Sequence, residues 1–275
     1  MTRSFFVAAL LLTQAATASA GERIVTLAPH LAELVCAVHA CRDLVGVVAY
    51  TDAPAEAARL PQIGSAVAIN AEAVLALQPT RVLAWDGGTP ETTIARLREL
   101  GLPVERIAIR DLDAIAPALE HLGAELGHAA DGETAAAAYR RRLADLRDRY
   151  RDRPRLRAFY QIETGPVYTV NGDSPISAAL DLCGADNVFA SLPALSTIVS
   201  PEAVLAADPD VVVHARDENP RGMAAFWARL TPARAARPTR QVAVDANALT
   251  RQSPRVLDGI AELCEGLDRV RRDAR

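Results

Sequence analysis

Apolar residues along this chain alternate between short β-branched runs and longer segments with a spacing of three or four residues. The run RIVTL at residues 23–27 is typical of a buried strand, and the spacing in residues 31–39 is typical of an amphipathic helix. Strands that alternate with helices predict a parallel α/β lobe. The predicted strands are residues 23–27, 44–49, 81–84 and 104–109, and the predicted helices are residues 31–39, 71–77, 91–100 and 112–126, the last irregular at Pro117.

Residues 131–153 replace this alternation with one long charged helix. The segment has no Pro or Gly after Gly132, and charged residues surround a single narrow apolar stripe. We expect Asp131 to cap this helix and Pro154 to end it. It is either a solvated amphipathic helix on one lobe or a strut between two bodies. The stripe consists of Ala136, Tyr139, Leu143, Leu146 and Tyr150.

The alternation restarts after Pro154 and contains an internal repeat. NAEAVLALQPTRVLAW at residues 70–85 and SPEAVLAADPDVVVHA at residues 200–215 are identical at seven of sixteen positions. A chance match of a common helix–Pro–strand unit is the alternative, but we favour a duplicated lobe, which in turn favours the strut. The predicted organisation is a signal peptide at 1–20, an α/β lobe at 21–130, a connecting helix at 131–153 and an α/β lobe at 154–275.

The N-terminus and the cysteines indicate export. Arg3, an apolar run and a final Ala-Ser-Ala predict a secretory signal cleaved before Gly21. The four cysteines of an exported chain favour disulfides, and pairing within each half is the simplest of the three possible arrangements. A metal bound by the C-x4-C segment is the weaker alternative, because no second pair of ligands lies nearby. The expected pairs are Cys36 with Cys41 and Cys183 with Cys264.

Composition and motifs argue against two functional classes. The formal net charge is −4, and no arginine cluster is interleaved with aromatic residues, so a nucleic-acid partner is not expected. The motifs of serine hydrolases, zinc proteases, P-loop enzymes and dinucleotide-binding enzymes are missing from the sequence. We therefore expect no enzyme; the rival hypothesis is an exported enzyme with a nucleophile and a base in its cleft.

Residues at the ends of predicted strands are the candidates for a binding cleft, because α/β sheets bind ligands there. His30 follows the first strand and is a candidate axial ligand to a bound metal complex, although a lone histidine is more often structural. Facing lobes with aromatic residues in this position predict a ligand-binding module. The candidates are His30, Tyr50, Trp85, Asp86, Gly87 and Gly88 in the first half, and Tyr168, Asn171, Asp173, Ser196, Thr197, Asp245, Leu249, Thr250 and Arg251 in the second.

Several stretches taken together, including RIVTLAPHLAELV, LVGVVAYTDAP, NAEAVLALQPTRVLAWDGG, VYTVNGDSPISAALDLCGADNVFA and SPRVLDGIAELC, match one known family. They resemble the periplasmic substrate-binding proteins of ABC importers for cobalamin, haem and iron–siderophores. The resemblance implies a class III fold, two Rossmann-like lobes joined by one backbone helix, in a monomer. It implies that Glu72 and Glu202 dock onto arginines of the membrane subunits. It also implies the pairing of Cys183 with Cys264.

The same resemblance implies cobalamin or a related corrinoid as the transported ligand. Tyr50, Trp85 and Tyr168 stand where the cobalamin binder has aromatic residues, whereas Ala66 and Ser196 replace tryptophans and leave room. Haem, ligated by His30, Tyr50 or Tyr168, and an iron–siderophore are the alternatives. The non-functional explanation for both glutamates is that the helix dipole favours a carboxylate near a helix N-terminus. A third functional hypothesis is a sensor that uses the two glutamates to dock another partner.

Overall fold

The computed structural model describes residues 21–163, 165–230 and 233–273, so the predicted signal peptide lies outside the described residues. The N-terminal lobe contains strands β1 (Ile24–Thr26), β2 (Leu44–Gly46), β5 (Arg81–Trp85) and β6 (Val104–Ile107), the hairpin of β3 (Gly64–Ser65) and β4 (Ala68–Ile69), and helices α1 (Pro29–Ala37), α2 (Ala71–Ala76), α3 (Glu91–Glu99) and α4 (Ile115–Glu125). The four longer strands form a parallel sheet in the order β2-β1-β5-β6. In its centre, Val82 pairs with Val25 on one side and Val104 on the other.

The C-terminal lobe repeats this plan. It contains strands β7 (Leu156–Gln161), β9 (Ala185–Asn187), β11 (Val211–Ala215) and β12 (Gln241–Val244), the ribbon of β8 (Tyr168–Val170) and β10 (Ser196–Ile198), and helices α6 (Pro175–Leu182), α7 (Pro201–Ala207), α8 (Pro220–Arg229), α9 (Ala246–Thr250) and α10 (Val256–Asp273). Its parallel sheet has the order β12-β11-β7-β9. In both sheets the first strand of the lobe is flanked by the second and the third, and the fourth lies outside the third. The fold is therefore two Rossmann-like lobes of the same topology.

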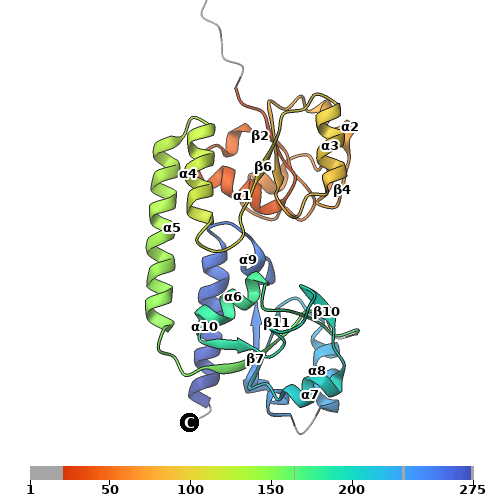
Figure 1. Cartoon of the computed structure of the whole chain (residues 1–275), viewed down its shortest axis with the longest axis vertical. Helices are drawn as coiled ribbons and strands as arrows, with labels where there is room; N and C mark the ends of the chain where they lie inside the picture. The colour runs from red at the N-terminus through yellow and green to blue at the C-terminus, as the bar shows by residue number, and fades with distance from the viewer. Residues whose placement is uncertain (1–20, 164, 231–232, 274–275) are drawn as a thin grey trace, which may run out of the picture.

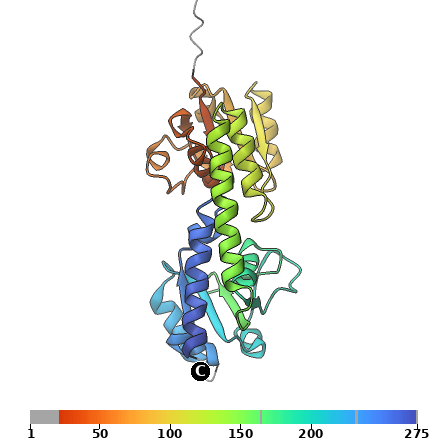
Figure 2. The same cartoon turned by 90° about the vertical axis from the view of Figure 1, so that its left-hand side faces the viewer.

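A single helix, α5 (Ala129–Tyr150), joins the lobes, as the charged segment predicts. It stands at the left of Figure 1 and in front in Figure 2, where it reaches from one lobe to the other. It begins two residues earlier than predicted, and Asp131 is not its cap; that expectation is wrong. Asp131 lies in the first turn instead, where its carboxylate accepts a hydrogen bond from His128 Nδ1 at 3.2 Å. The helix ends before residue 153 because a residue that precedes proline avoids helical geometry.

The apolar stripe of α5 connects the cores of the two lobes. All five stripe residues are buried in one continuous hydrophobic cluster that includes Leu83 of β5 and Val213 of β11. Each sheet has a second, smaller core on its other face. Close packing of α4 on α5 depends on two glycines, since a Cβ on Gly123 would lie 2.7 Å from the Cα of Gly132. The strut therefore packs against both lobes as part of their common core.

The sequence repeat is reproduced in three dimensions. Helices α2 and α7 are both capped by the side chain before them: Asn70 accepts from the Ala73 N–H at 3.1 Å, and Ser200 accepts from the Ala203 N–H at 3.2 Å. Residues 71–79 and 201–209 have the same succession of buried, intermediate and exposed positions. A duplicated helix therefore lies in the same environment in each lobe.

Equivalent features also end the two helices. Gln78 and Asp208, at matching repeat positions before a proline, both have a positive φ, 47° and 40°. Arg23 donates to the Leu77 carbonyl at 2.7 Å, and Arg157 donates to the Ala207 carbonyl at 2.6 Å. These arginines satisfy carbonyl groups that a helix end leaves without partners.

Both expected disulfides are present. Cys36 pairs with Cys41 in the N-terminal lobe, with 4.1 Å between their Cα atoms. Cys183 pairs with Cys264 in the C-terminal lobe, with 4.8 Å between their Cα atoms. Neither bridge connects the two lobes.

Candidate functional site

A cavity of about 550 Å³ lies between the lobes. Its walls come from loops at the carboxyl ends of β1 and β5 and from the segments that begin α6 and follow α9. This is the place where open α/β sheets present ligand contacts. The N-terminal lobe contributes Ala28, Pro29, His30, Ala49, Tyr50, Ala66, Trp85 and Arg110, and the C-terminal lobe contributes Asp173, Ser174, Pro175, Ile176, Leu195, Thr250, Arg251 and Gln252.

Two aromatic residues dominate the N-terminal wall. Tyr50 is 81% exposed, with a φ of 64°, and Trp85 is half-buried at the end of β5. The indole position depends on the next loop, because a Cβ on Gly88 would overlap the Trp85 ring at 1.8 Å. Gly87 has a φ of 88° and forms the turn. The two glycines therefore place a flat apolar surface on this wall.

His30 lines the cavity beside Trp85 but is almost completely buried. It is 5% exposed, and the edge of its ring packs on Trp85, with the ring centroids 5.2 Å apart and the planes at 87°. Burial, together with the positive charge of Arg251, lowers the pKa of His30 to about 3, so the ring is neutral at neutral pH. Its Nε2 atom is covered by protein and has no hydrogen-bond partner. In this conformation that nitrogen is not exposed to the cavity.

A network of charged groups holds the two lobes together beside the cavity. Arg251 donates to the Tyr50 carbonyl at 2.9 Å, and Arg255 pairs with both carboxylate oxygens of Asp52 at 3.1 and 3.2 Å. Glu33 accepts from the Ser253 hydroxyl and from Arg255 at 3.4 Å. Burial raises the pKa of Glu33, although these partners oppose that effect. We call Glu33, Asp52, Arg251, Ser253 and Arg255 the interlobe network.

The structure brings six of the fifteen predicted cleft residues into the cavity lining: His30, Tyr50, Trp85, Asp173, Thr250 and Arg251. The other nine lie outside that lining, among them Gly88, Asn171, Thr197 and Leu249. Asp86 pairs with Arg106 at 2.6 Å, and Gly87 forms the turn before Gly88. Tyr168 and Ser196 lie on the β8–β10 ribbon, and Asp245 caps α9 by accepting from the Ala248 N–H at 3.0 Å.

Arg110, Gln252 and Leu195 are among the lining residues that were not anticipated. Arg110 follows β6, and the rule that placed His30 and Trp85 at strand ends would have found it. Gln252 directly follows the predicted contact Arg251. Leu195 precedes β10, a strand of three residues that is too short to leave a pattern in the sequence.

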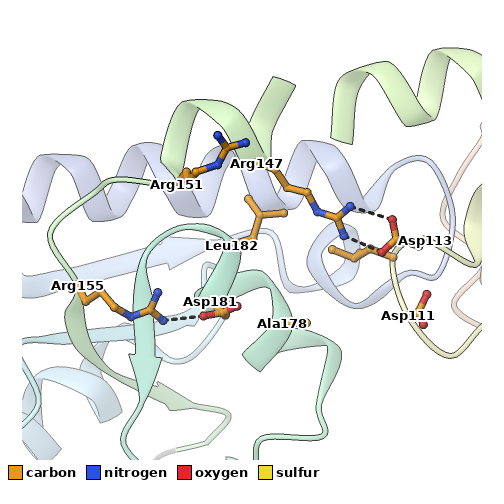
Figure 3. A pocket seen from close by; sticks show the side chains of 9 residues that line it. Asp111, Asp113, Arg147, Arg151, Arg155, Ala178, Asp181 and Leu182 are labelled. Carbon is orange, nitrogen blue, oxygen red and sulfur yellow. Dashed lines mark hydrogen bonds and ion pairs between the residues drawn. The ribbon is translucent and has the colours of Figure 1, made fainter. Parts of the chain in front are cut away.

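Two other hollows contain charged side chains that already pair with one another, which makes them less suited to a ligand. One, of about 490 Å³, lies where the end of α5 meets α6. Figure 3 shows Arg147 directed at Asp113 and Arg155 directed at Asp181 around it, with closest distances of 2.7 Å in both pairs. The other, of about 800 Å³, lies beside the Cys36–Cys41 disulfide and contains the Arg142–Asp258 ion pair.

Glu72 and Glu202 lie outside the cavity at equivalent places. Both are exposed in the first turn of their helices, α2 and α7. Hydrogen bonds from its own backbone N–H and from the Ser200 hydroxyl lower the pKa of Glu202. Figure 1 places both helices on the side of the molecule opposite α5. The two glutamates thus place an exposed carboxylate at the same position of the repeat in each lobe.

Neither a metal site nor a membrane span is evident in the described part of the chain. Its His, Cys, Asp and Glu residues form no group of three or more that could hold a metal ion. Across residues 21–163, 165–230 and 233–273, no helix has the length and apolar character needed to cross a membrane.

Comparisons with known proteins agree with this architecture. Residues 24–229 match the family described as periplasmic binding protein. The chain is 32% identical over 254 residues to a vitamin B12-binding protein of Vibrio parahaemolyticus, which covers 91% of both chains. The crystal structure of the periplasmic vitamin B12 binding protein BtuF of Vibrio cholerae has a TM-score of 0.82 and 32% identity, over 91% of this chain and 98% of that one. The haem-binding protein RhuT from Roseiflexus sp. RS-1 has a TM-score of 0.80 and 27% identity, over 91% and 99%. This chain, with its two Rossmann-like lobes and single connecting helix, belongs to the periplasmic binding protein family.

Proposed function

We propose that this protein binds cobalamin or a related corrinoid in the periplasm and delivers it to an ABC importer of the inner membrane. The observation that carries the proposal is the interlobe cavity of about 550 Å³ with Tyr50 and Trp85 on one wall. Aromatic faces offer a large apolar contact to a flat macrocycle. The likeness to vitamin B12-binding proteins over about nine-tenths of the chain supports the same ligand class.

Polar groups on the opposite wall suit the edge of such a ligand. Asp173, Thr250 and Arg251 of the C-terminal lobe line the cavity and supply both donors and acceptors. A corrinoid presents amide groups around its rim, and each amide needs hydrogen-bond donors as well as acceptors from the protein. We keep Asp86, Gly87, Tyr168, Ser196 and Asp245 as candidate contacts for parts of the ligand that extend beyond the cavity. The proposal includes no catalytic turnover.

The proposed route to the ligand begins with export. Residues 1–20 act as the signal peptide, and the mature chain begins at Gly21. Two disulfides among the described residues suit an oxidising compartment such as the periplasm. The mature protein acts as a monomer.

Glu72 and Glu202 are the proposed docking residues for the two membrane subunits. Their equivalent, exposed positions on duplicated lobes would meet an importer of two-fold symmetry with the same contact twice. Exposed ion pairs with arginines steer the encounter more than they stabilise the complex. Reversing both charges, with Glu72→Arg and Glu202→Arg, should abolish corrinoid uptake and leave ligand affinity intact. Glu133→Arg with Glu265→Arg, the same change of charge at exposed positions on α5 and α10, is the control; uptake unchanged in the first pair would contradict the docking role.

A haem is the second candidate ligand. Tyr50 is the observation that favours it, because an 81% exposed tyrosine in the cavity has a hydroxyl available to iron, whereas His30 does not offer its Nε2. The similarity to haem-binding RhuT agrees with this possibility.

Calorimetric titration of the mature chain with cyanocobalamin, cobinamide and hemin separates the candidates. We expect one corrinoid to bind at each protein molecule, and hemin to bind more weakly. Hemin that binds more tightly than both corrinoids, with a shifted Soret band that Tyr50→Phe abolishes, would replace the first proposal with the second.

A further inference from the structure

The duplicated helices carry exposed leucines as well as glutamates. Leu75 is 44% exposed on α2 and Leu205 is 37% exposed on α7. Each lies three residues after the glutamate of its lobe, so it shares a helix face with that glutamate. Burial of the intervening Val74 and Val204 fixes this orientation. A single exposed leucine needs no explanation, but the same exposure at matching positions of two lobes does.

Other exposed apolar residues lie just before the same two helices. Val67 precedes the cap of α2 by three residues, and Ile198 precedes the cap of α7 by two, and both side chains are exposed. Among the described residues, the remaining exposed large apolar side chains are Tyr50 and Leu195, which line the cavity. Within the described ranges, the large exposed apolar residues that do not line the cavity therefore all lie within five residues of Glu72 or Glu202 in the sequence.

We propose that Leu75 and Leu205 are a pair of apolar docking contacts, each of which enters an apolar hollow beside the arginine of one membrane subunit. The proposal rests on the proposed function, and it adds to the charge contact a source of affinity that salt does not screen. The occupant is a two-fold symmetric partner, because the duplicated helices present one acidic and one apolar contact in the same order on each lobe. Charge selects the basic site on the partner, and the leucine supplies area removed from water.

Binding to the importer at two salt concentrations tests this division of roles. The probe is the source organism's corrinoid importer, with its ATPase subunits, in lipid nanodiscs. We expect Leu75→Asn or Leu205→Asn to weaken binding about threefold to tenfold, and the two together about tenfold to a hundredfold, because the sites lie on separate lobes and act independently. The fold-loss of binding caused by each leucine substitution should be the same at 50 mM and 500 mM NaCl, since salt does not screen apolar contacts.

The glutamate variants give the contrasting result. Glu72→Gln with Glu202→Gln should weaken binding strongly at 50 mM NaCl and by much less at 500 mM NaCl, where the charges are screened. Ala138→Asn, an exposed apolar position on α5, is the control for the leucine substitutions. Unchanged melting temperature and corrinoid affinity would show that each variant is folded.

The possible outcomes separate this inference from the proposed function. If the leucine pair binds the importer as tightly as the unaltered protein while the glutamate pair does not, the apolar contact is refuted and the docking proposal stands. If neither pair weakens binding, or if the unaltered protein does not bind, both are refuted. A dimer of the free protein that the leucine substitutions dissociate, or equal loss of binding to empty nanodiscs, would assign the leucines to a second copy or to lipid and overturn the inference.

Discussion

The two lobes share a scaffold but present different surfaces to the cavity. Strand order, helix caps, the arginine at each helix end and the positive φ before each proline are the same in both. The walls differ: the N-terminal lobe contributes Tyr50 and Trp85, and the C-terminal lobe contributes Asp173, Thr250 and Arg251. Features set by packing and backbone hydrogen bonds are kept in both copies, whereas loop residues at strand ends differ between them. This difference agrees with the proposal that the shared part docks and the part that differs selects the ligand.

The largest expected difference between the lobes concerns their disulfides. Cys183 and Cys264 are 81 residues apart in sequence, whereas Cys36 and Cys41 are five apart. Cross-linking a longer loop removes more entropy from the unfolded chain. Replacing Cys183 and Cys264 by alanine should lower the free energy of unfolding by about 4 kcal/mol. Replacing Cys36 and Cys41 by alanine should lower it by about 2 kcal/mol. Urea titrations measure both values; equal losses would show that loop length does not set the contribution of each bridge.

Acid should destabilise the protein through the N-terminal lobe. The pKa of His30 is about 3 in the folded state, below its value of 6.5 in the unfolded chain, so its contribution is full above pH 6.5 and is lost as the pH falls towards 3. Between pH 7 and pH 5 the loss amounts to about 2 kcal/mol. Glu33, whose pKa is raised, acts in the opposite direction in acid.

Comparison of the unaltered protein with His30→Gln isolates this effect, because Glu33 is common to both. The difference between their free energies of unfolding should shrink by about 2 kcal/mol from pH 7 to pH 5. A difference that is constant over this range would mean that folding does not lower the pKa of His30.

Ligand affinity should depend more on the N-terminal wall than on the C-terminal wall. Trp85→Ala removes a large aromatic face and should weaken corrinoid binding by about tenfold to a hundredfold. Leu195→Ala, the matched apolar truncation on the other wall, should weaken binding by about threefold or less. Titration calorimetry gives both ratios, and a larger effect at Leu195 would reverse the assignment of the walls.

The smallest expected effect tests what the lobes share. Asn70→Ala and Ser200→Ala each remove the side-chain cap of a duplicated helix. Each should cost about 1 kcal/mol of stability, and the two costs should be similar. A cost in only one lobe would show that the two helices, despite their common geometry, do not depend equally on their caps.

The sequence predicts the local parts of this architecture better than the long-range ones. The repeat and the α5 stripe were visible because burial of an amphipathic unit leaves a short-range pattern. The bonds from Arg23 to Leu77 and from Arg157 to Ala207 were not, since they join residues more than 45 positions apart.

Two errors have identifiable physical causes. Helix α8, which was not predicted from the sequence, begins at Pro220 with the Asn219 side chain as its cap; that signal was present in the sequence. Pro117 was expected to make its helix irregular, but α4 begins at Ile115, so the proline lies in the first turn, where no N–H is needed.

The cleft residues divide in the same way. His30, Tyr50 and Trp85 follow predicted strands, so the strand-end rule identified them. Tyr168 and Ser196 belong to the β8–β10 ribbon, whose pairing across more than twenty residues has no local signature, and its Leu195 neighbour lines the cavity instead.

Tryptophan fluorescence tests the central claim, corrinoid binding in the interlobe cavity, most directly. Trp85 lines the cavity, whereas Trp227, the other tryptophan, is buried in the C-terminal core and donates to Gln161 at 3.0 Å. In Trp227→Phe, which keeps Trp85 alone, cyanocobalamin should quench the emission saturably, with the affinity found by calorimetry. In Trp85→Phe the quenching of Trp227 should be weaker. Calorimetric binding without saturable quenching of Trp85 would place the corrinoid elsewhere and contradict the account.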